Sequence, residues 1–194
     1  MDVVNKSKSD INPIFQKTDL IITASHDACG SENGAGFLER YSSRNQAIIM
    51  EIMRNLVEYA LVERIYLGGS IGGETIALHY GLCYRKVSKK LRFIVVVPVT
   101  VEYQPIETWE TIKCADDIIC LDLQPYKYGL PDHKIYYVRN KHIFHIAMLN
   151  TKYDLKKIGV LAFCNGNFSI NPHSVLSIAN NFGIDIEKIE LIDF

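Results

Sequence analysis

No apolar stretch of the chain approaches the ~20 consecutive residues that a membrane-spanning helix needs. Positive charge is not in excess either, because 21 basic residues stand against 22 acidic ones and the formal net charge is -1. This balance gives no overall sign of the basic face that sequence-independent nucleic-acid binders carry, although a local patch is compatible with it. The first residues, MDVVNKSKSDINP, lack the basic-then-apolar layout of a secretory signal. We therefore expect a cytoplasmic protein with no membrane partner.

Cysteine pairs with zinc-ligand spacing are also missing, since the five cysteines are scattered without a C-x-x-C motif. We expect them to be reduced and mostly buried. His142 and His145 are three residues apart but have no close third ligand. The sequence therefore predicts neither a metal site nor a bound cofactor.

What the chain does have is enough apolar material for a core: 194 residues, of which 48% are hydrophobic and 22% charged. This length is most simply one domain. Residues 1–17 are polar and aperiodic, so we expect a tail or a strap across the surface. Residues 18–194 are expected to form a single domain, because no internal repeat or low-complexity linker divides them.

Apolar runs and amphipathic segments alternate along this domain. Short apolar, strand-like runs separated by segments with helical spacing are typical of a parallel sheet covered on both faces. The predicted strands are 19–25, 64–69, 91–99, 117–123, 158–163 and 186–192, and the predicted helices are 44–62, 72–85, 106–115, 139–150 and 171–183. The fold class expected is α/β, with an open, mostly parallel, Rossmann-like sheet and helices on both faces.

Ligands of such sheets bind beyond the carboxyl ends of the strands, near the point where the strand order reverses. The loops that follow the predicted strands are therefore the candidate site, and they are rich in glycine and in hydrogen-bonding side chains. The candidate residues are Ser25 and His26 after the first strand, Gly68, Gly69, Ser70, Gly72 and Gly73 after the second, Pro98 after the third, and Asn165, Gly166, Asn167 and Ser169 after the fifth.

The segment LGGSIGGETI, residues 67–76, places glycines between a strand and a helix. It satisfies most of the phosphate-binding G-x-x-x-x-G-K-[ST] template, but Glu74 stands where the lysine should be. Glycines and the first N–H groups of the helix can hold a phosphate without a lysine, and Glu74 is then placed to accept a hydrogen bond from a ribose hydroxyl. The alternative is a tight turn in which Glu74 only complements the helix dipole.

Two further stretches carry chemistry. Arg139 and Asn140 are expected at the start of the helix 139–150, where arginine can grip a phosphate through paired donors. The alternative is a surface ion pair with an N-capping asparagine. The polar loop 164–174 either offers donors to a ligand or serves as a turn that caps the next helix through Asn171.

The order of these pieces resembles the SLOG superfamily, which joins Smf/DprA-type proteins, LOG phosphoribohydrolases and YpsA-like proteins. The resemblance covers about residues 19–192 and rests on GGSIGGETIALHYG, FIVVVPV, CADDIICL, RNKHIFHIA and IGVLAF in this order. It implies a nucleotide pocket. LOG enzymes use a loop P-G-G-x-G-T-x-x-E whose glutamate works with an arginine that Arg139 matches. Here the loop reads CNGNFSINPHSVL and supplies no glutamate, which puts catalysis in doubt.

Three functions follow as hypotheses. The first is a binding protein or sensor for a nucleotide or an NAD-derived nucleotide, with phosphate at the Gly68–Gly73 turn and Arg139. The second is an N-glycoside hydrolase or ribosyltransferase with Glu74 and Arg139 as catalytic residues. The third is single-stranded DNA binding, with stacking on Tyr126, Tyr128, Tyr136 and Tyr137 beside Lys127 and Lys134. A homo-oligomer is also expected, with helix 44–62 as a candidate interface or, equally, as a helix packed on the sheet.

Overall fold

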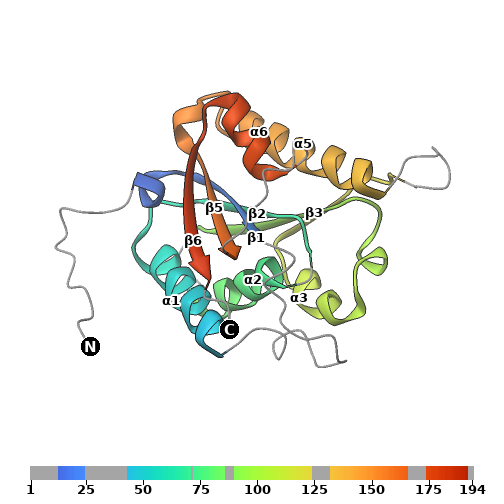
Figure 1. Cartoon of the computed structure of the whole chain (residues 1–194), viewed down its shortest axis with the longest axis horizontal. Helices are drawn as coiled ribbons and strands as arrows, with labels where there is room; N and C mark the ends of the chain where they lie inside the picture. Colours follow the sequence, from blue (N-terminus) through green and yellow to red (C-terminus); the bar gives the residue numbers. More distant parts are fainter. Residues whose placement is uncertain are drawn as a thin grey trace.

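A computed structural model describes residues 13–24, 43–70, 72–85, 90–123, 132–165 and 174–191 (Figure 1). Within these residues the strands form one sheet of six, in the order β4-β3-β2-β1-β5-β6, and every pairing is parallel. The strands are β1 (Asp19–Ala24), β2 (Arg64–Leu67), β3 (Arg92–Val97), β4 (Asp117–Cys120), β5 (Ile158–Asn165) and β6 (Asp185–Leu191). The predicted parallel α/β sheet is confirmed.

Helices cover both faces of this sheet, as predicted (Figure 1). One face carries α1 (Ser43–Tyr59), α2 (Gly73–Tyr84) and α3 (Trp109–Lys113), and the other carries α5 (Asp132–Asn150) and α6 (Val175–Phe182). Short 3-10 turns complete the described part: η1 (Pro13–Gln16), η3 (Val101–Tyr103), η4 (Ile106–Thr108) and η5 (Leu155–Lys157). Helix α1, the predicted interface or packing helix, buries Ile49, Met53 and Leu56 in the core that it shares with α2.

The sheet contributes side chains to two separate cores because successive strand residues point to opposite faces. In β3, Phe93 and Val95 belong to the core under α1 and α2, whereas Ile94 and Val96 belong to the core under α5 and α6. This two-sided burial explains why FIVVVPV reads as a continuous apolar run and not as an alternating one.

The strand order reverses between β1 and β5. From β1 the chain steps outward through β2 and β3 to β4, and α5 then carries it back across the sheet to β5, which pairs with the other side of β1. The carboxyl ends of β1 and β5 therefore flank the topological switch point, where an open α/β sheet binds its ligand.

The N-terminal segment is described from Pro13 onward. Ile14 is 3% exposed and packs in the core with β1 residues, and Lys17 Nζ donates to the carbonyl of Lys156 over 3.0 Å and pairs with Asp185. Residues 13–17 thus form a strap across the amino ends of β5 and β6, anchored by one buried isoleucine and one ion pair.

Candidate functional site

The turn between β2 and α2 is shaped by glycine. Gly69 has φ 70, and Gly72, the N-cap of α2, has φ 103 and ψ -134. Residues other than glycine rarely adopt backbone conformations with such positive φ angles. A Cβ on Gly69 would also lie 3.1 Å from the Ile112 side chain and 3.2 Å from that of Val95. Gly72 has no side chain that could cap the helix, so the first backbone N–H groups of α2 receive no side-chain acceptor from their N-cap.

Glu74 lies in the first turn of α2, as predicted, and is only 4% exposed. Its Oε2 accepts hydrogen bonds from the backbone N–H groups of Gly68, at 2.9 Å, and Ser70, at 3.2 Å. Thr75 closes the same turn, since its Oγ1 donates to the carbonyl of Ser70 over 2.7 Å. The Glu74 carboxylate therefore bends back from the helix to hold the turn, and its predicted contact with a ribose hydroxyl stays a prediction.

Arg139 holds the turn from the opposite face of the sheet. Its Nη1 donates to the carbonyl of Gly68 over 3.0 Å and to Ser70 Oγ over 3.1 Å, and the residue is 5% exposed. Nε and Nη2 donate to Asn140 Oδ1 at 3.1 and 2.8 Å. The guanidinium carbon also lies 5.1 Å from the centre of the Tyr136 ring, within the range of a cation–π contact.

Burial lowers the pKa of Arg139 below its ordinary value, while the nearby Glu74 carboxylate and Tyr136 act in the opposite direction. An arginine nevertheless stays protonated in proteins. A buried cation and a buried carboxylate thus brace one turn. Glu74 accepts hydrogen bonds from the N–H groups of the turn, and Arg139 donates to its carbonyl and hydroxyl oxygens. Their opposite charges offset each other, which limits the cost of burying both.

The position of Arg139 and Asn140 corrects one prediction. They were expected at the start of a helix, but α5 begins at Asp132 and both residues lie well inside it. They face the sheet, where both are buried, so Asn140 is not an N-cap and Arg139 is not part of a surface ion pair. The dipeptide Pro131–Asp132 is a helix-start signal that places the boundary correctly.

The structure therefore brings together Gly68, Gly69, Ser70, Gly72, Gly73, Glu74, Arg139 and Asn140. Pro98 follows β3 at the same edge of the sheet and accepts a hydrogen bond from the N–H of Leu123 over 2.8 Å. Asn165 ends β5 and pairs with Leu191 of β6. The other predicted ligand residues, Ser25, His26, Gly166, Asn167 and Ser169, lie outside the described residues.

Some of the tyrosines considered for base stacking lie within the described residues and others lie outside them. Tyr126, Tyr128 and Lys127 lie outside the described residues. Tyr136 and Tyr137 are in α5, where Tyr136 stacks on Arg139. The centre of the Tyr137 ring lies 4.6 Å from Lys141 Nζ. The ring of Tyr136 thus already supports the buried guanidinium.

In the described part of the chain no three histidine, cysteine, aspartate or glutamate side chains are grouped so that they could hold a metal ion. No helix within the described residues is both long and apolar enough to span a bilayer. No protein-family model matches the chain, and no curated protein sequence matches it. The similarity to the SLOG superfamily consequently rests on the residues quoted above.

Proposed function

We propose that the chain binds a nucleotide and that the phosphate lies at the start of α2. The glycine N-cap at Gly72 supports this proposal, because it ends the turn that follows β2, and β2 is the strand next to β1 at the switch point between β1 and β5. The N–H groups of the first helical turn have no partners within the helix and carry the positive end of the helix dipole, so they favour an anion.

Glu74 and Arg139 act in this proposal as supports of the turn. The Glu74 carboxylate accepts N–H groups from Gly68 and Ser70, which precede the helix, and so leaves the N–H groups of the helix start to the ligand. Arg139 offsets its charge from the other side of the turn. The loops that contain Ser25, His26 and residues 165–169 follow β1 and β5, which flank the switch point, so we assign them to the sugar and the base.

Because Glu74 and Arg139 support the turn, binding is favoured over bond cleavage. A general acid or a nucleophile must be within reach of the sugar, whereas Glu74 is buried and its Oε2 is engaged by two backbone donors. Arg139 is equally buried against Gly68 and Asn140. Neither group is presented as the free carboxylate or guanidinium that glycosidic cleavage needs.

Isothermal titration of the purified chain with mononucleotides, cyclic nucleotides and ADP-ribose tests the proposal. We expect heat of binding with at least one of them, and a loss of about ten-fold or more in affinity for Gly72→Ala, because alanine cannot hold the backbone of the N-cap without strain. The matched control is Gly183→Ala, another positive-φ glycine, which caps α6 with nothing within 4 Å of an added Cβ. Gly183→Ala should bind as the wild type does; the absence of heat with every nucleotide would contradict the proposal.

A further inference from the structure

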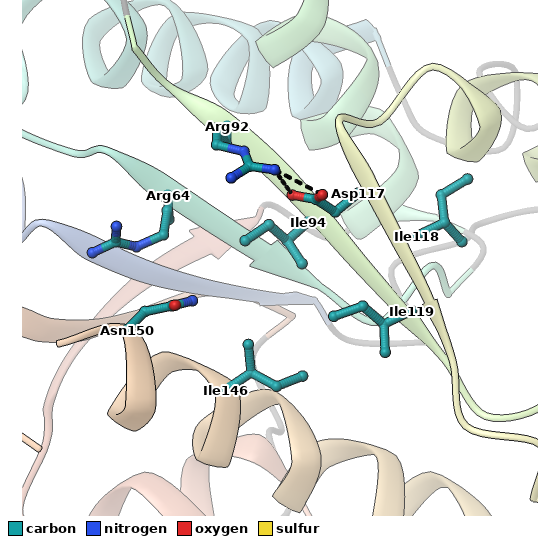
Figure 2. Close-up of a pocket in the computed structure, with 8 residues that line it drawn as sticks. All are labelled: Arg64, Arg92, Ile94, Asp117, Ile118, Ile119, Ile146 and Asn150. Carbon is teal, nitrogen blue, oxygen red and sulfur yellow. Dashed lines mark hydrogen bonds and ion pairs between the residues drawn. The ribbon is translucent and has the colours of Figure 1, made fainter. Parts of the chain in front are cut away.

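A hollow lies at the amino ends of β2, β3 and β4, on the sheet face that α5 covers. It has a volume of about 330 Å³, and Figure 2 shows its lining: strand residues on one side and Ile146 and Asn150 of α5 on the other. Arg64, the first residue of β2, lines this hollow, and Gly68 follows the last residue of the same strand. The hollow and the nucleotide site proposed above are thus at opposite ends of β2.

Two arginines line the hollow side by side. Arg64 and Arg92 are register partners on neighbouring parallel strands, so their side chains leave the same face of the sheet about 5 Å apart at the backbone. Arg64 is bound to the buried Asp19 of the neighbouring strand β1, with Nε at 2.6 Å and Nη2 at 2.8 Å from the carboxylate oxygens. Arg92 pairs through Nη2 with Asp117 at 2.6 Å.

These two ion pairs differ in strength. The Arg64 pair is bidentate and its carboxylate is fully buried, so it is geometrically fixed. The Arg92 side chain is 57% exposed and that of Asp117 is 35% exposed, and pairs of this kind contribute little and exchange partners readily. Since a guanidinium has five N–H donors, Arg92 is the group that can bind an incoming anion.

Isoleucines supply the apolar part of the lining. Ile94 of β3 is buried, and Ile119 of β4 and Ile146 of α5 are partly buried around the hollow. Asn150 donates through Nδ2 to the hydroxyl of Tyr66 over 2.8 Å, and that hydroxyl donates to Asp19, so the Asn150 amide orientation is determined and its carbonyl oxygen remains an acceptor. The hollow therefore combines isoleucine side chains, the exposed Arg92–Asp117 pair, the fixed Arg64 and one oriented amide.

We propose that this hollow binds a small amphipathic anion, whose apolar body lies on the isoleucines and whose carboxylate or phosphate binds Arg92. The volume is within the usual range of small-molecule sites, about 300–1,000 Å³. Asp117 is the one carboxylate among the lining residues and is engaged by Arg92 Nη2, whereas the Arg92 guanidinium has further N–H donors, which favours an anion over a cation. An inorganic anion alone would leave the isoleucine surface in water, and an uncharged apolar molecule would desolvate the Arg92–Asp117 pair without giving Arg92 a further acceptor.

The test is a titration of the ¹⁵N-labelled chain with 1-naphthoate in which the amide chemical shifts are measured. 1-Naphthalenemethanol, which has a similar ring system and no charge, is the control ligand. We expect saturable shifts at the amides of Arg92, Ile94 and Ile119, and affinity for the alcohol lower by about ten-fold. Absence of shifts with millimolar 1-naphthoate, shifts confined to another surface, or equal affinity for the alcohol would each overturn the proposal.

Two variants with opposite expected effects sharpen the test. Arg92→Gln should lower the affinity for 1-naphthoate by about ten-fold, whereas Asp117→Asn, which removes the competing carboxylate, should raise this affinity. Arg85→Gln is the matched control, because Arg85 also pairs with an aspartate, Asp116, but does not line the hollow. The amide spectrum of each variant without ligand should match that of the folded wild type, which verifies that the variant is folded. An equal loss with Arg85→Gln and Arg92→Gln, or a weaker affinity in Asp117→Asn, would contradict the assignment of Arg92.

Discussion

Arg139 closes over Gly68. Its Nη1 donates to the Gly68 carbonyl over 3.0 Å, and a Cβ added to Gly68 would lie 2.4 Å from the Arg139 guanidinium carbon. A side chain at position 68 would therefore have to displace the hydrogen-bonded guanidinium, so the two residues form one unit at the carboxyl edge of the sheet.

Because the two residues form one unit, we expect substitutions at Gly68 and Arg139 to have non-additive effects on the free energy of unfolding. Gly68→Ala alone should destabilise the fold by about 1–3 kcal/mol through overpacking against the buried guanidinium. In the Arg139→Ala background the clash is absent, so the same change should cost less, with a coupling free energy of about 1–2 kcal/mol. Urea unfolding of the four proteins measures this cycle. Additive free energies of unfolding would show that the two residues do not depend on each other.

A second prediction concerns Glu74. Glu74→Gln removes the charge-assisted acceptance of the Gly68 and Ser70 N–H groups and leaves Arg139 without its nearby carboxylate, so we expect a loss of roughly 1–3 kcal/mol in unfolding free energy. Glu110→Gln is the control, because Glu110 also lies in the first turn of a helix but is exposed. The control should stay within about 0.5 kcal/mol of the wild type. A Glu74 variant as stable as the control would contradict the bracing role.

A third prediction is a pH dependence that arises at Tyr66. Burial raises the pKa of the Tyr66 phenol above its ordinary value, and the hydrogen bond to Asp19 acts in the same direction. The unfolded chain releases this proton near pH 10 while the folded chain retains it, so stability should fall as the pH rises above about 10. The stabilisation is fully present below that pH.

Tyr66→Phe should remove this part of the alkaline decline. At pH 7 it should also lower the unfolding free energy by about 1–2 kcal/mol, because Asn150 and Asp19 each lose a hydrogen-bond partner. Urea unfolding at neutral and alkaline pH measures both effects. Tyr153→Phe, at an exposed ring, is expected to behave as the wild type does. An unchanged alkaline slope in Tyr66→Phe would show that another group causes the decline.

The strap at residues 13–17 leads to a fourth prediction. Ile14 is buried in the core, and a Cβ on Gly159 of β5 would lie 2.5 Å from its Cδ1. Ile14→Ala should therefore cost about 2–4 kcal/mol, whereas Ile106→Ala, at an isoleucine that is 68% exposed, should cost under about 0.5 kcal/mol. Equal thermal midpoints for the two variants would indicate that the segment is a tail that does not contribute to the core.

The sheet was predictable because its strands carry a local signal. Segments such as FIVVVPV are apolar on both faces, and each is bounded by glycine, proline or charged residues, so a parallel α/β order can be inferred from neighbouring residues alone. The glycine turn after β2 was predictable for the same reason, since Gly72 and Glu74 lie within one strand-turn-helix segment.

The bracing of that turn was not predictable in the same way. Arg139 is 71 positions from Gly68, and only the crossover of α5 above the sheet brings its guanidinium onto the carbonyl of Gly68. The network of Asp19, Tyr66 and Asn150 likewise joins three distant segments at the amino edge of the sheet. Both depend on the packing of α5, which local spacing cannot specify.

The proposed function depends on a nucleotide phosphate that binds the N–H groups at the start of α2. Its most direct test follows the amide resonances of Gly72 and Gly73 while the ¹⁵N-labelled chain is titrated with the tightest-binding nucleotide and, separately, with its nucleoside. We predict large, saturable shifts at these two amides with the nucleotide and much smaller ones with the nucleoside. Saturable nucleotide binding that leaves both amides unmoved, or equal shifts with the nucleoside, would contradict the proposed function.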